Sequence, residues 1–492
     1  MSIRMSRTHG CRASTLAVMT FSIAFTAAGG AQGNPTQSAK ADVVRAIEAQ
    51  HAHYADVAKQ IWTFAEVGFK ETRSSALLQQ ELRSAGFAVE AGVAGMPTAF
   101  IATFGSGKPV IGLFAEYDAL PGLSQDAVPV QKPLGAEAGH GCGHHLLGTA
   151  SVDAAVALKD WLAKSKRSGT IRLYGTPAEE GGSGKVYLVR DGFFNDVDVV
   201  IGWHPGDDNS ATSTPSLANI SGRFRFRGIS AHAAASPEKG RSALDAVEAM
   251  DNMVNMMREH VPQETRIHYV ITNGGRAPNV VPDFAEVYYY VRSPDNRVLQ
   301  DVWDRVVKAA QGAAMGTGTT VDNEITGGVY SLLPNETLGR LMDANLRALG
   351  GIQYTPDERS FAETLRRSLD RPVLPLGSEA QVQPYVANAP AMSGSTDVGD
   401  ISWTVPTAQI STATWVPGTP AHSWQATAAG GMSIGPKAAT LAAKAMASTV
   451  IELLLDPSLI AKAKAELAQR RGAGFQYRPL LGERKPALNY RG

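Results

Sequence analysis

Three short apolar runs, each bounded by turn residues, constrain the fold of this chain most strongly. A convincing helical segment, residues 146–163, lies between the first run and the second. Strands that alternate with helices favour a mainly parallel sheet with helices on both faces. In such a sheet ligands bind beyond the carboxyl ends of the strands, so the residues that follow each run are the ones to inspect for chemistry. The runs are PVIGLFAE (109–116), TIRLYGTP (170–177) and DVVIGWHP (198–205).

The pattern changes near Gly222, where RFRFRG (223–228) shows strict alternation of apolar and polar side chains. Such alternation is typical of a strand with one solvated face. Further strand-like segments follow, with two amphipathic helices, 242–261 and 296–314, between them. We therefore expect an inserted α+β domain of ferredoxin-like type, with the order β-α-β-β-α-β, at residues 221–332. Residues 32–220 and 333–492 would then form the two parts of one larger domain.

Residues 1–31 have the layout of a cleavable signal peptide. Arg4, Arg7 and Arg12 precede an apolar stretch at 13–28, and small residues follow it. A membrane anchor is the alternative, but the stretch is shorter than the roughly 20 residues that a membrane span needs. We therefore expect a protein that is exported to the periplasm or secreted.

Charge balance argues against two classes of partner. The 492 residues include 46 Lys and Arg and 46 Asp and Glu, so the chain has no net charge. Because no long basic stretch is present either, binding to nucleic acid or to an anionic membrane has little electrostatic support. We expect a small-molecule partner.

The densest cluster of reactive side chains is GHGCGHHLLG (139–148), just before the predicted helix. Cys142 and His144 alternate as they would on an extended approach to that helix, so both can point into one cavity. Thiolate and imidazole are good ligands for zinc-like ions. Cys142 is also the one cysteine that would remain after loss of the leader, so it has no internal disulfide partner. The alternative is a tight glycine turn with incidental histidines.

Two adjacent carboxylates, Glu179 and Glu180, follow the second apolar run in GTPAEEGGSG (175–184). One carboxylate of such a pair can bind a metal ion while its neighbour moves a proton. Taken alone, a Glu-Glu pair is more often solvated surface.

His204 directly follows the third apolar run, and His422 lies in the loop after a predicted strand at 407–415. Either histidine alone would more often be a packing residue than a ligand. Four ligand-bearing segments at strand ends are nevertheless hard to explain except as one site. A serine-hydrolase elbow at 431–435 is a weak alternative, because no apolar strand precedes Ser433.

At these motifs the chain resembles the aminoacylase/carboxypeptidase family of co-catalytic metallopeptidases. The resemblance is to its amidohydrolase branch, which includes p-aminobenzoyl-glutamate and auxin-conjugate hydrolases, and it covers nearly the whole chain after the leader. The motifs that carry it are AEVGFKE (65–71), AEYDALPG (115–122), GHGCGHH (139–145), PAEEGGSG (177–184), SAHAAASPEKG (230–240), APNVVPD (277–283), GSTDVGD (394–400) and TPAHS (419–423).

The resemblance implies two divalent metal ions in each protomer, zinc or manganese or else cobalt, and a proton-shuttling Glu179. It also implies that the inserted domain is both a lid and the surface of a homodimer, with His232 reaching a neighbouring active site. Asn279 and Arg292 would contact the oxygens or carboxylate of the substrate. The five implied metal ligands are Cys142, His144, Glu180, His204 and His422.

The expected reaction is hydrolysis of the amide bond of an N-acyl or N-aroyl amino acid. A dipeptidase or aminopeptidase on the same scaffold and a metal-dependent binding protein are the rival interpretations. Asp118 is expected to orient a ligand from behind, as metal-bound imidazoles usually require. His145 departs from the family, in which many members have an acidic residue at that position.

Overall fold

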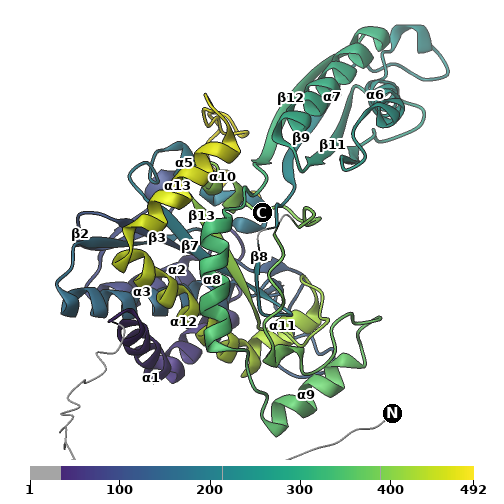
Figure 1. Cartoon of the computed structure of the whole chain (residues 1–492). Helices are drawn as coiled ribbons and strands as arrows, with labels where there is room; N and C mark the ends of the chain where they lie inside the picture. The colour runs from purple at the N-terminus through teal and green to yellow at the C-terminus, as the bar shows by residue number, and fades with distance from the viewer. Residues whose placement is uncertain (1–34, 213, 388, 492) are drawn as a thin grey trace, which may run out of the picture.

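A seven-stranded sheet in the order β1-β2-β6-β3-β7-β13-β8 forms the centre of the larger domain (Figure 1). Its four middle strands, β6, β3, β7 and β13, are mutually parallel, whereas β1, β2 and β8 pair antiparallel at the edges. The prediction of a mainly parallel sheet is therefore confirmed. The strands are β1 (Ala88–Ala91), β2 (Phe100–Ser106), β3 (Val110–Ala115), β6 (Gly169–Gly175), β7 (Val199–Gly206), β8 (Ser210–Thr212) and β13 (Thr407–Ala413).

The computed structural model describes residues 35–212, 214–387 and 389–491. The predicted signal peptide at 1–31 lies outside these described residues.

Helices cover both faces of the sheet, as predicted. Helix α3 (His144–Ser165) packs on the face that carries Trp203, whose indole N–H donates to the Leu147 carbonyl at 3.2 Å. Helix α5 (Gly184–Arg190) packs on the opposite face, where the Lys185 ammonium lies over the Phe114 ring. The two faces differ because successive side chains of a strand alternate in direction.

Three long helices pack together on the α3 side: α1 (Pro35–Phe64), α3 and α12 (Ile434–Leu455). Among the described residues, α12 is the one helix long and apolar enough to cross a membrane, but most of it is buried inside the protein. Its many alanines let the neighbouring helices approach closely. The remaining elements are α2 (Thr72–Ser84), β4 (Leu120–Pro121), β5 (Ala138–Gly139), α4 (Glu179–Gly182), α8 (Glu336–Leu349), α9 (Pro356–Arg366), α10 (Val398–Ser402), α11 (Trp424–Gly431) and α13 (Pro457–Arg471).

The inserted domain is an antiparallel sheet in the order β10-β11-β9-β12, with two helices on one face. Its elements follow the predicted β-α-β-β-α-β order. They are β9 (Ala218–Arg227), α6 (Ala243–Met257), β10 (Arg266–Asn273), β11 (Phe284–Ser293), α7 (Asn296–Thr317) and β12 (Thr320–Val329).

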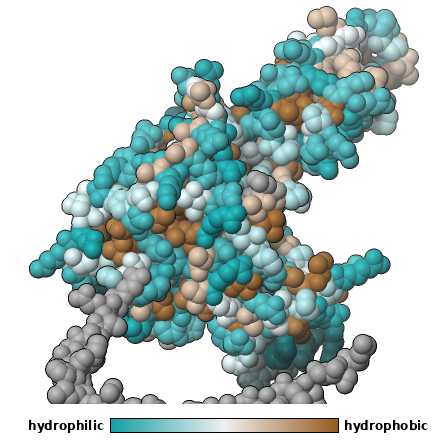
Figure 2. All heavy atoms as spheres, in the orientation of Figure 1, coloured by the Kyte–Doolittle hydropathy of each residue, from teal (hydrophilic) through white to brown (hydrophobic). Residues whose placement is uncertain are grey.

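The alternating segment in β9 explains why this domain has a core of its own. Phe224 and Phe226 are fully buried under the helices, while Arg225 on the other face pairs with Glu286 and Glu324. Figures 1 and 2 show the domain projecting from the larger one. The inserted domain, which we call the lid, thus has a hydrophobic core separate from that of the larger domain.

Candidate metal centre

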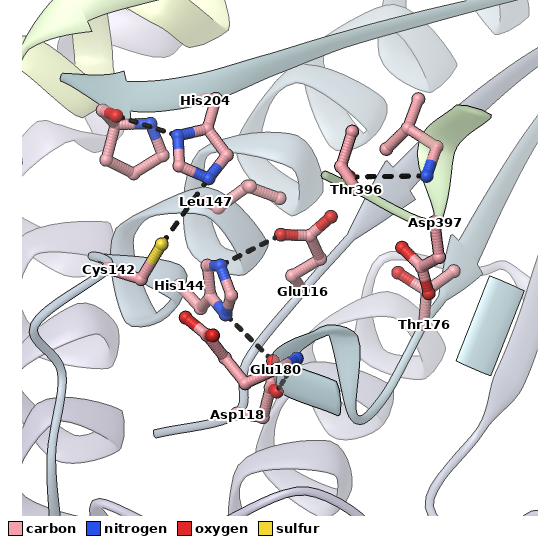
Figure 3. A network of polar contacts seen from close by, with 12 residues as sticks. Glu116, Asp118, Cys142, His144, Leu147, Thr176, Glu180, His204, Thr396 and Asp397 are labelled. Atoms are coloured by element: carbon pink, nitrogen blue, oxygen red, sulfur yellow. Dashed lines mark hydrogen bonds and ion pairs between the residues drawn. The ribbon is translucent and has the colours of Figure 1, made fainter. Parts of the chain in front are cut away.

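The ends of the parallel strands bring the predicted site residues together. Glu180 follows β6, His204 lies near the end of β7, and His422 lies in the loop after β13. Cys142 and His144 enter from the start of α3 (Figure 3). The ligand atoms of Cys142, His144 and His204 lie within 4.8 Å of one another, and so do those of Cys142, Glu180 and His422. Because both groups contain Cys142, the arrangement has the form of two adjacent cation sites that share one thiol.

Buried polar atoms without hydrogen-bond partners test whether these groups fit metal ions. Within the described residues His144 Nε2 and Glu180 Oε1 are both buried and make no hydrogen bond. A polar atom left in this way costs free energy unless something binds it. Glu116 Oε2 lies 3.1 Å from His144 Nε2, and His422 Nε2 lies 3.1 Å from Glu180 Oε1. Unsatisfied nitrogen and oxygen atoms beside a thiol are what divalent cations of the zinc class bind, so the residues fit the implied metals.

The outer nitrogens of two imidazoles are held by hydrogen bonds. Asp118 Oδ1 lies 2.8 Å from His144 Nδ1, as the sequence predicted for this carboxylate. His204 Nδ1 lies 2.8 Å from the Pro205 carbonyl oxygen, to which it can donate. Both contacts leave Nε2 as the ring nitrogen that can bind a cation, and His204 Nε2 lies 3.6 Å from Cys142 Sγ. Partners of this kind fix the tautomer and orientation of an imidazole ligand.

Burial controls the protonation of the thiol. It raises the pKa of Cys142 well above its usual range, an effect that neighbouring His144 only partly offsets. Without a bound cation the buried thiol therefore favours its neutral form. A bound cation would stabilise the thiolate, and loading it would release a proton.

Glu179 and Glu180 differ in the direction of their pKa shifts. Burial raises the pKa of Glu179 well above its usual range, and the nearby Glu116 carboxylate adds to the shift. Burial also acts to raise the pKa of Glu180, but the hydrogen bond with His422 and the nearby His144 together outweigh it, so the net pKa is lowered. The two carboxylates thus differ in proton affinity, with Glu179 the one that holds a proton more readily and Glu180 the one more readily ionised.

A buried ion-pair network behind the site was not predicted from sequence. Lys185 Nζ lies 2.7 Å from both Glu116 Oε1 and Asp397 Oδ1, and all three side chains are at most 1% exposed. The Lys185 N–H also donates to Asp397 Oδ2 at 3.0 Å. Because Glu116 approaches His144, the network supports the metal centre from the α5 side of the sheet. Asp397 and Glu116 lie inside the motifs GSTDVGD and AEYDALPG, which were the available indications.

The loop with Glu179 and Glu180 is held in an unusual backbone conformation. Ala178, Gly181 and Ser183 have φ of 58°, 95° and 56°, in the left-handed region. The Ala178 N–H donates to Glu71 Oε1 at 2.8 Å, and the Glu180 N–H donates to Asp118 Oδ2 at 2.9 Å. Strained backbone of this kind persists where surrounding contacts over-determine it. Glu71 was another residue that sequence reasoning missed, and burial raises its pKa to about 8.

The three predicted lid residues occupy two different places. Arg292 lies at the junction of the domains, where its guanidinium donates to Ser395 Oγ at 3.1 Å. His232 and Asn279 are exposed on neighbouring segments. A hydrogen bond from the Ala233 N–H to the Asn279 carbonyl, 3.0 Å long, connects these segments. Within the described residues, the His232 ring accepts hydrogen bonds from the lid backbone at Ala234 and Ala235. The structure thus brings Arg292 to the catalytic domain and leaves the other two on the lid.

His145 and Ser433 lie outside the metal groups. His145 Nε2 lies 3.0 Å from the Gly430 carbonyl, and burial lowers the pKa of this imidazole well below its usual range. His145 therefore packs as a neutral residue against α11. The Ser433 hydroxyl donates to Glu358 Oε1 at 2.7 Å, so it joins the cap region of α9 rather than a nucleophile elbow.

Comparison with known proteins agrees with this geometry. A family model for the peptidase dimerisation domain matches residues 218–316. The chain is 44% identical over 450 residues to one chain of the p-aminobenzoyl-glutamate hydrolase of Escherichia coli, covering 86% of this chain and 94% of that protein. It is 31% identical over 426 residues to a mouse Xaa-Arg dipeptidase, covering 83% and 88% of the two chains.

Solved structures share the fold at lower identity. A dinuclear metal-binding M20 peptidase from Bacillus subtilis matches with a TM-score of 0.56 at 18% identity, over 83% of this chain and 99% of that one. A Staphylococcus aureus protein described as a putative aminohydrolase matches with a TM-score of 0.63 at 17% identity, over 84% and 100% of the two chains. Together with the 44% identity to the Escherichia coli hydrolase, these findings show that the chain belongs to the M20 family of metal-dependent amidohydrolases and peptidases.

Proposed function

We propose that this enzyme hydrolyses the amide bond of N-acyl or N-aroyl amino acids that carry a free carboxylate, of the p-aminobenzoyl-glutamate type. The observation that carries the proposal is the pair of ligand groups that share Cys142, together with a third group in which Glu179 lies close to His144 and Glu116. The name of the Escherichia coli relative supports the substrate class.

Cys142, His144, Glu180, His204 and His422 would hold the two cations, for which we propose zinc, manganese or cobalt. Bound there, divalent ions supply Lewis acidity that polarises the amide carbonyl and makes water more nucleophilic. The chain's own residues would orient these charges, because Asp118 and the Pro205 carbonyl fix the two imidazoles.

Glu179 would move the proton. Its carboxylate accepts a proton from the attacking water and returns it to the amide nitrogen as the carbon–nitrogen bond breaks. A raised pKa suits this role, because a carboxylate of ordinary pKa holds a transferred proton only weakly.

The lid would supply the contacts to substrate. Arg292 at the domain junction is suited to a carboxylate, because a guanidinium forms two parallel charge-assisted bonds with it. His232 and Asn279 would add hydrogen bonds to the carbonyl oxygen when the lid closes or when a second protomer presents them.

A homodimer through the lid is the proposed assembly. Large apolar side chains are exposed on α6 and on β10, an edge strand of the lid sheet: Met256 is 65% exposed and Val270 56%. Exposed apolar groups and an unpaired strand edge are features that protein interfaces cover. The match of this region to a peptidase dimerisation domain supports the same assembly.

A substrate panel tests the reaction. Purified enzyme stripped of metal and then loaded with zinc, manganese or cobalt should release the amino acid from N-benzoyl, N-acetyl and p-aminobenzoyl conjugates, with Glu179→Gln as the matched inactive control. Saturable binding without turnover by any loaded form would instead favour the binding-protein interpretation and overturn the proposal.

A dipeptidase is the second candidate, because the mouse relative is named an Xaa-Arg dipeptidase. The two functions differ in whether the substrate needs a free amino group. Comparing a dipeptide with its N-acetylated form decides between them, since the amidohydrolase should accept the blocked form and a dipeptidase should reject it.

We also propose export through a cleaved leader, on the arrangement of arginines, apolar residues and small residues at 1–31. The intact mass of protein purified from its native host tests this. A mass that includes the leader would refute cleavage.

A further inference from the structure

The segment that follows α13 has no regular structure, and its sequence offers no periodicity from which to assign it. We call residues 477–491 the C-terminal strap. In Figure 1 the yellow C-terminal segment beyond α13 lies on the side of the larger domain that carries the lid. The strap makes specific contacts with both domains along its length.

Its first half touches the base of the lid. The Arg484 guanidinium donates to the Ile325 carbonyl of β12 at 2.7 Å and lies 3.3 Å from Glu324 Oε1. Leu480 packs so closely on Gly328 that a Cβ there would approach it to 2.8 Å. On the other side, Arg190 of α5 donates to the Arg484 carbonyl at 2.7 Å. The strap therefore joins the last lid strand to the catalytic domain.

Its final residues reach the loop of Glu179 and Glu180. Tyr490 Oη donates to the Glu180 carbonyl at 3.0 Å, and the Arg491 guanidinium donates to the same oxygen. The Tyr490 ring meets Phe69 edge to face, with ring centroids 5.7 Å apart. At Gly68 an added Cβ would come within 2.2 Å of Tyr490 Oη, so glycine leaves the space that this hydroxyl occupies.

The accepting carbonyl belongs to a peptide unit that can rotate. Glu180 has ψ of 62°, and the next residue, Gly181, has φ of 95°. Glycine is permissive at that angle, so the Glu180–Gly181 peptide has little intrinsic preference for the observed orientation. The N–H of Glu180 donates to Asp118. The carbonyl oxygen of Glu180 accepts hydrogen bonds from Tyr490 and Arg491 of the strap.

We propose that Tyr490 and Arg491 are positioning residues that fix the Glu180–Gly181 peptide, and through it the carboxylates of Glu179 and Glu180. The proposal rests on the proposed function, in which Glu180 binds a cation and Glu179 moves the proton. It assigns to the strap a role in the geometry of the metal centre as well as in joining the domains.

The decisive variant is Tyr490→Phe, which removes one hydrogen bond and keeps the ring against Phe69. Arg491→Gln is its companion, and Lys485→Ala, an exposed position on the same strap, is the matched control. Loss of one hydrogen bond shifts an equilibrium by up to about tenfold. We expect Tyr490→Phe to lower kcat by about tenfold with KM nearly unchanged, and the double variant to lower it further.

Two readouts are independent of turnover. The dissociation constant of the weaker-bound cation, titrated against a chelator, should rise by up to about tenfold in Tyr490→Phe. The visible absorption of the cobalt-loaded protein should also change, because the orientation of Glu180 changes, while Tm of the metal-free protein stays near that of wild type.

Wild-type kcat, cation affinity and cobalt spectrum in the double variant would overturn the proposal. So would an equal loss of kcat and Tm in Lys485→Ala, because the strap would then act only through stability. If the wild-type enzyme hydrolysed no conjugate, the proposed function would fail, and the chelator titration and the cobalt spectrum would still decide whether the strap positions Glu180.

Discussion

The candidate metal centre and the part of the inserted domain that carries His232 and Asn279 are built in opposite ways. His144, Glu116 and Lys185 are fully or almost fully buried, and each approaches a group of opposite charge or hydrogen-bonding character. His232 and Asn279 are exposed, and His232 bonds only lid backbone within the described residues. The contacts of the centre lie within its own domain, whereas His232 and Asn279 would need lid closure or a second protomer to take the role proposed for them.

This difference separates two requirements of catalysis. Ligands and a base must be held within a fraction of an ångström, which buried ion pairs and a strained loop can ensure. Groups that contact the substrate must admit it first, so they act better from a mobile body or a partner protomer. Substitutions in the buried centre and in the lid should therefore have different effects.

The largest effect is expected at the base. Glu179→Gln keeps the shape of the side chain and removes its ability to accept a proton, so kcat should fall roughly 10²- to 10⁴-fold. Metal content measured by elemental analysis should stay at the wild-type value, because Glu179 lies outside the two groups that share Cys142. Substantial residual turnover would remove Glu179 from this role.

The next effect concerns the stability of the pre-organised centre. Lys185→Met leaves Glu116 and Asp397 buried without their cation, and breaking a buried pair in this way costs about 3–5 kcal/mol. The matched lid variant is Arg225→Met, which breaks half-exposed pairs worth about 1 kcal/mol or less. Denaturant unfolding of both proteins measures the contrast. An equal decrease in the free energy of unfolding of the two variants would show that the buried and the partly exposed ion pairs contribute equally to stability.

Substitution of His232 tests whether this lid residue acts in the active site of its own protomer or of the neighbouring one. His232→Ala should lower kcat by roughly 10²- to 10³-fold, as for loss of an oxyanion donor, with unchanged metal content. If His232 acts on the neighbouring protomer, heterodimers of His232→Ala with Glu179→Gln regain activity, because one of the two sites then has both intact groups. Verified heterodimers as inactive as their parents would place His232 in the site of its own protomer and leave the metal ligands unaffected.

The parallel sheet and the proximity of the five candidate ligands follow from the sequence for the same physical reason. Each ligand segment follows an apolar run or adjoins a helix start, and parallel strands end at one edge of a sheet. The ferredoxin-like insertion was visible because RFRFRG alternates and its arginines need a solvated face. Features that depend on periodicity or on the ends of strands could therefore be predicted from the local sequence.

The missed residues depend on contacts between distant segments. Lys185 follows the glycine run and superficially fits a phosphate loop, and only the fold shows that Asp397, far along the chain, pairs with it. Glu71 and Tyr490 act on backbone atoms of the 178–183 loop, and no side-chain pattern records such a contact. Burial raises the pKa of the Cys142 thiol, and this burial depends on packing between distant segments that the sequence did not reveal.

The smallest expected effect is on the pH dependence of stability, which should differ between the two domains. Burial raises the pKa of Asp153 in α3 to about 8 and that of Asp251 in the lid to about 6, from a reference of 3.8. A carboxyl whose folded-state pKa is raised stabilises the fold while protonated, and this contribution is lost as pH rises from the reference value toward the folded-state pKa. The stability advantage of Asp153→Asn over wild type should therefore grow until about pH 8 and then level off, reaching about 1 kcal/mol or more.

Asp251→Asn is the lid counterpart, and its advantage over wild type should stop growing near pH 6, because above that pH Asp251 is ionised in both the folded and the unfolded protein. Thermal unfolding of wild type and both variants at several pH values across this range measures the two end points. Profiles for Asp153→Asn that run parallel to wild type would show that this buried carboxylate stays ionised, and that the larger domain tolerates the charge in its helical layer as readily as the lid does.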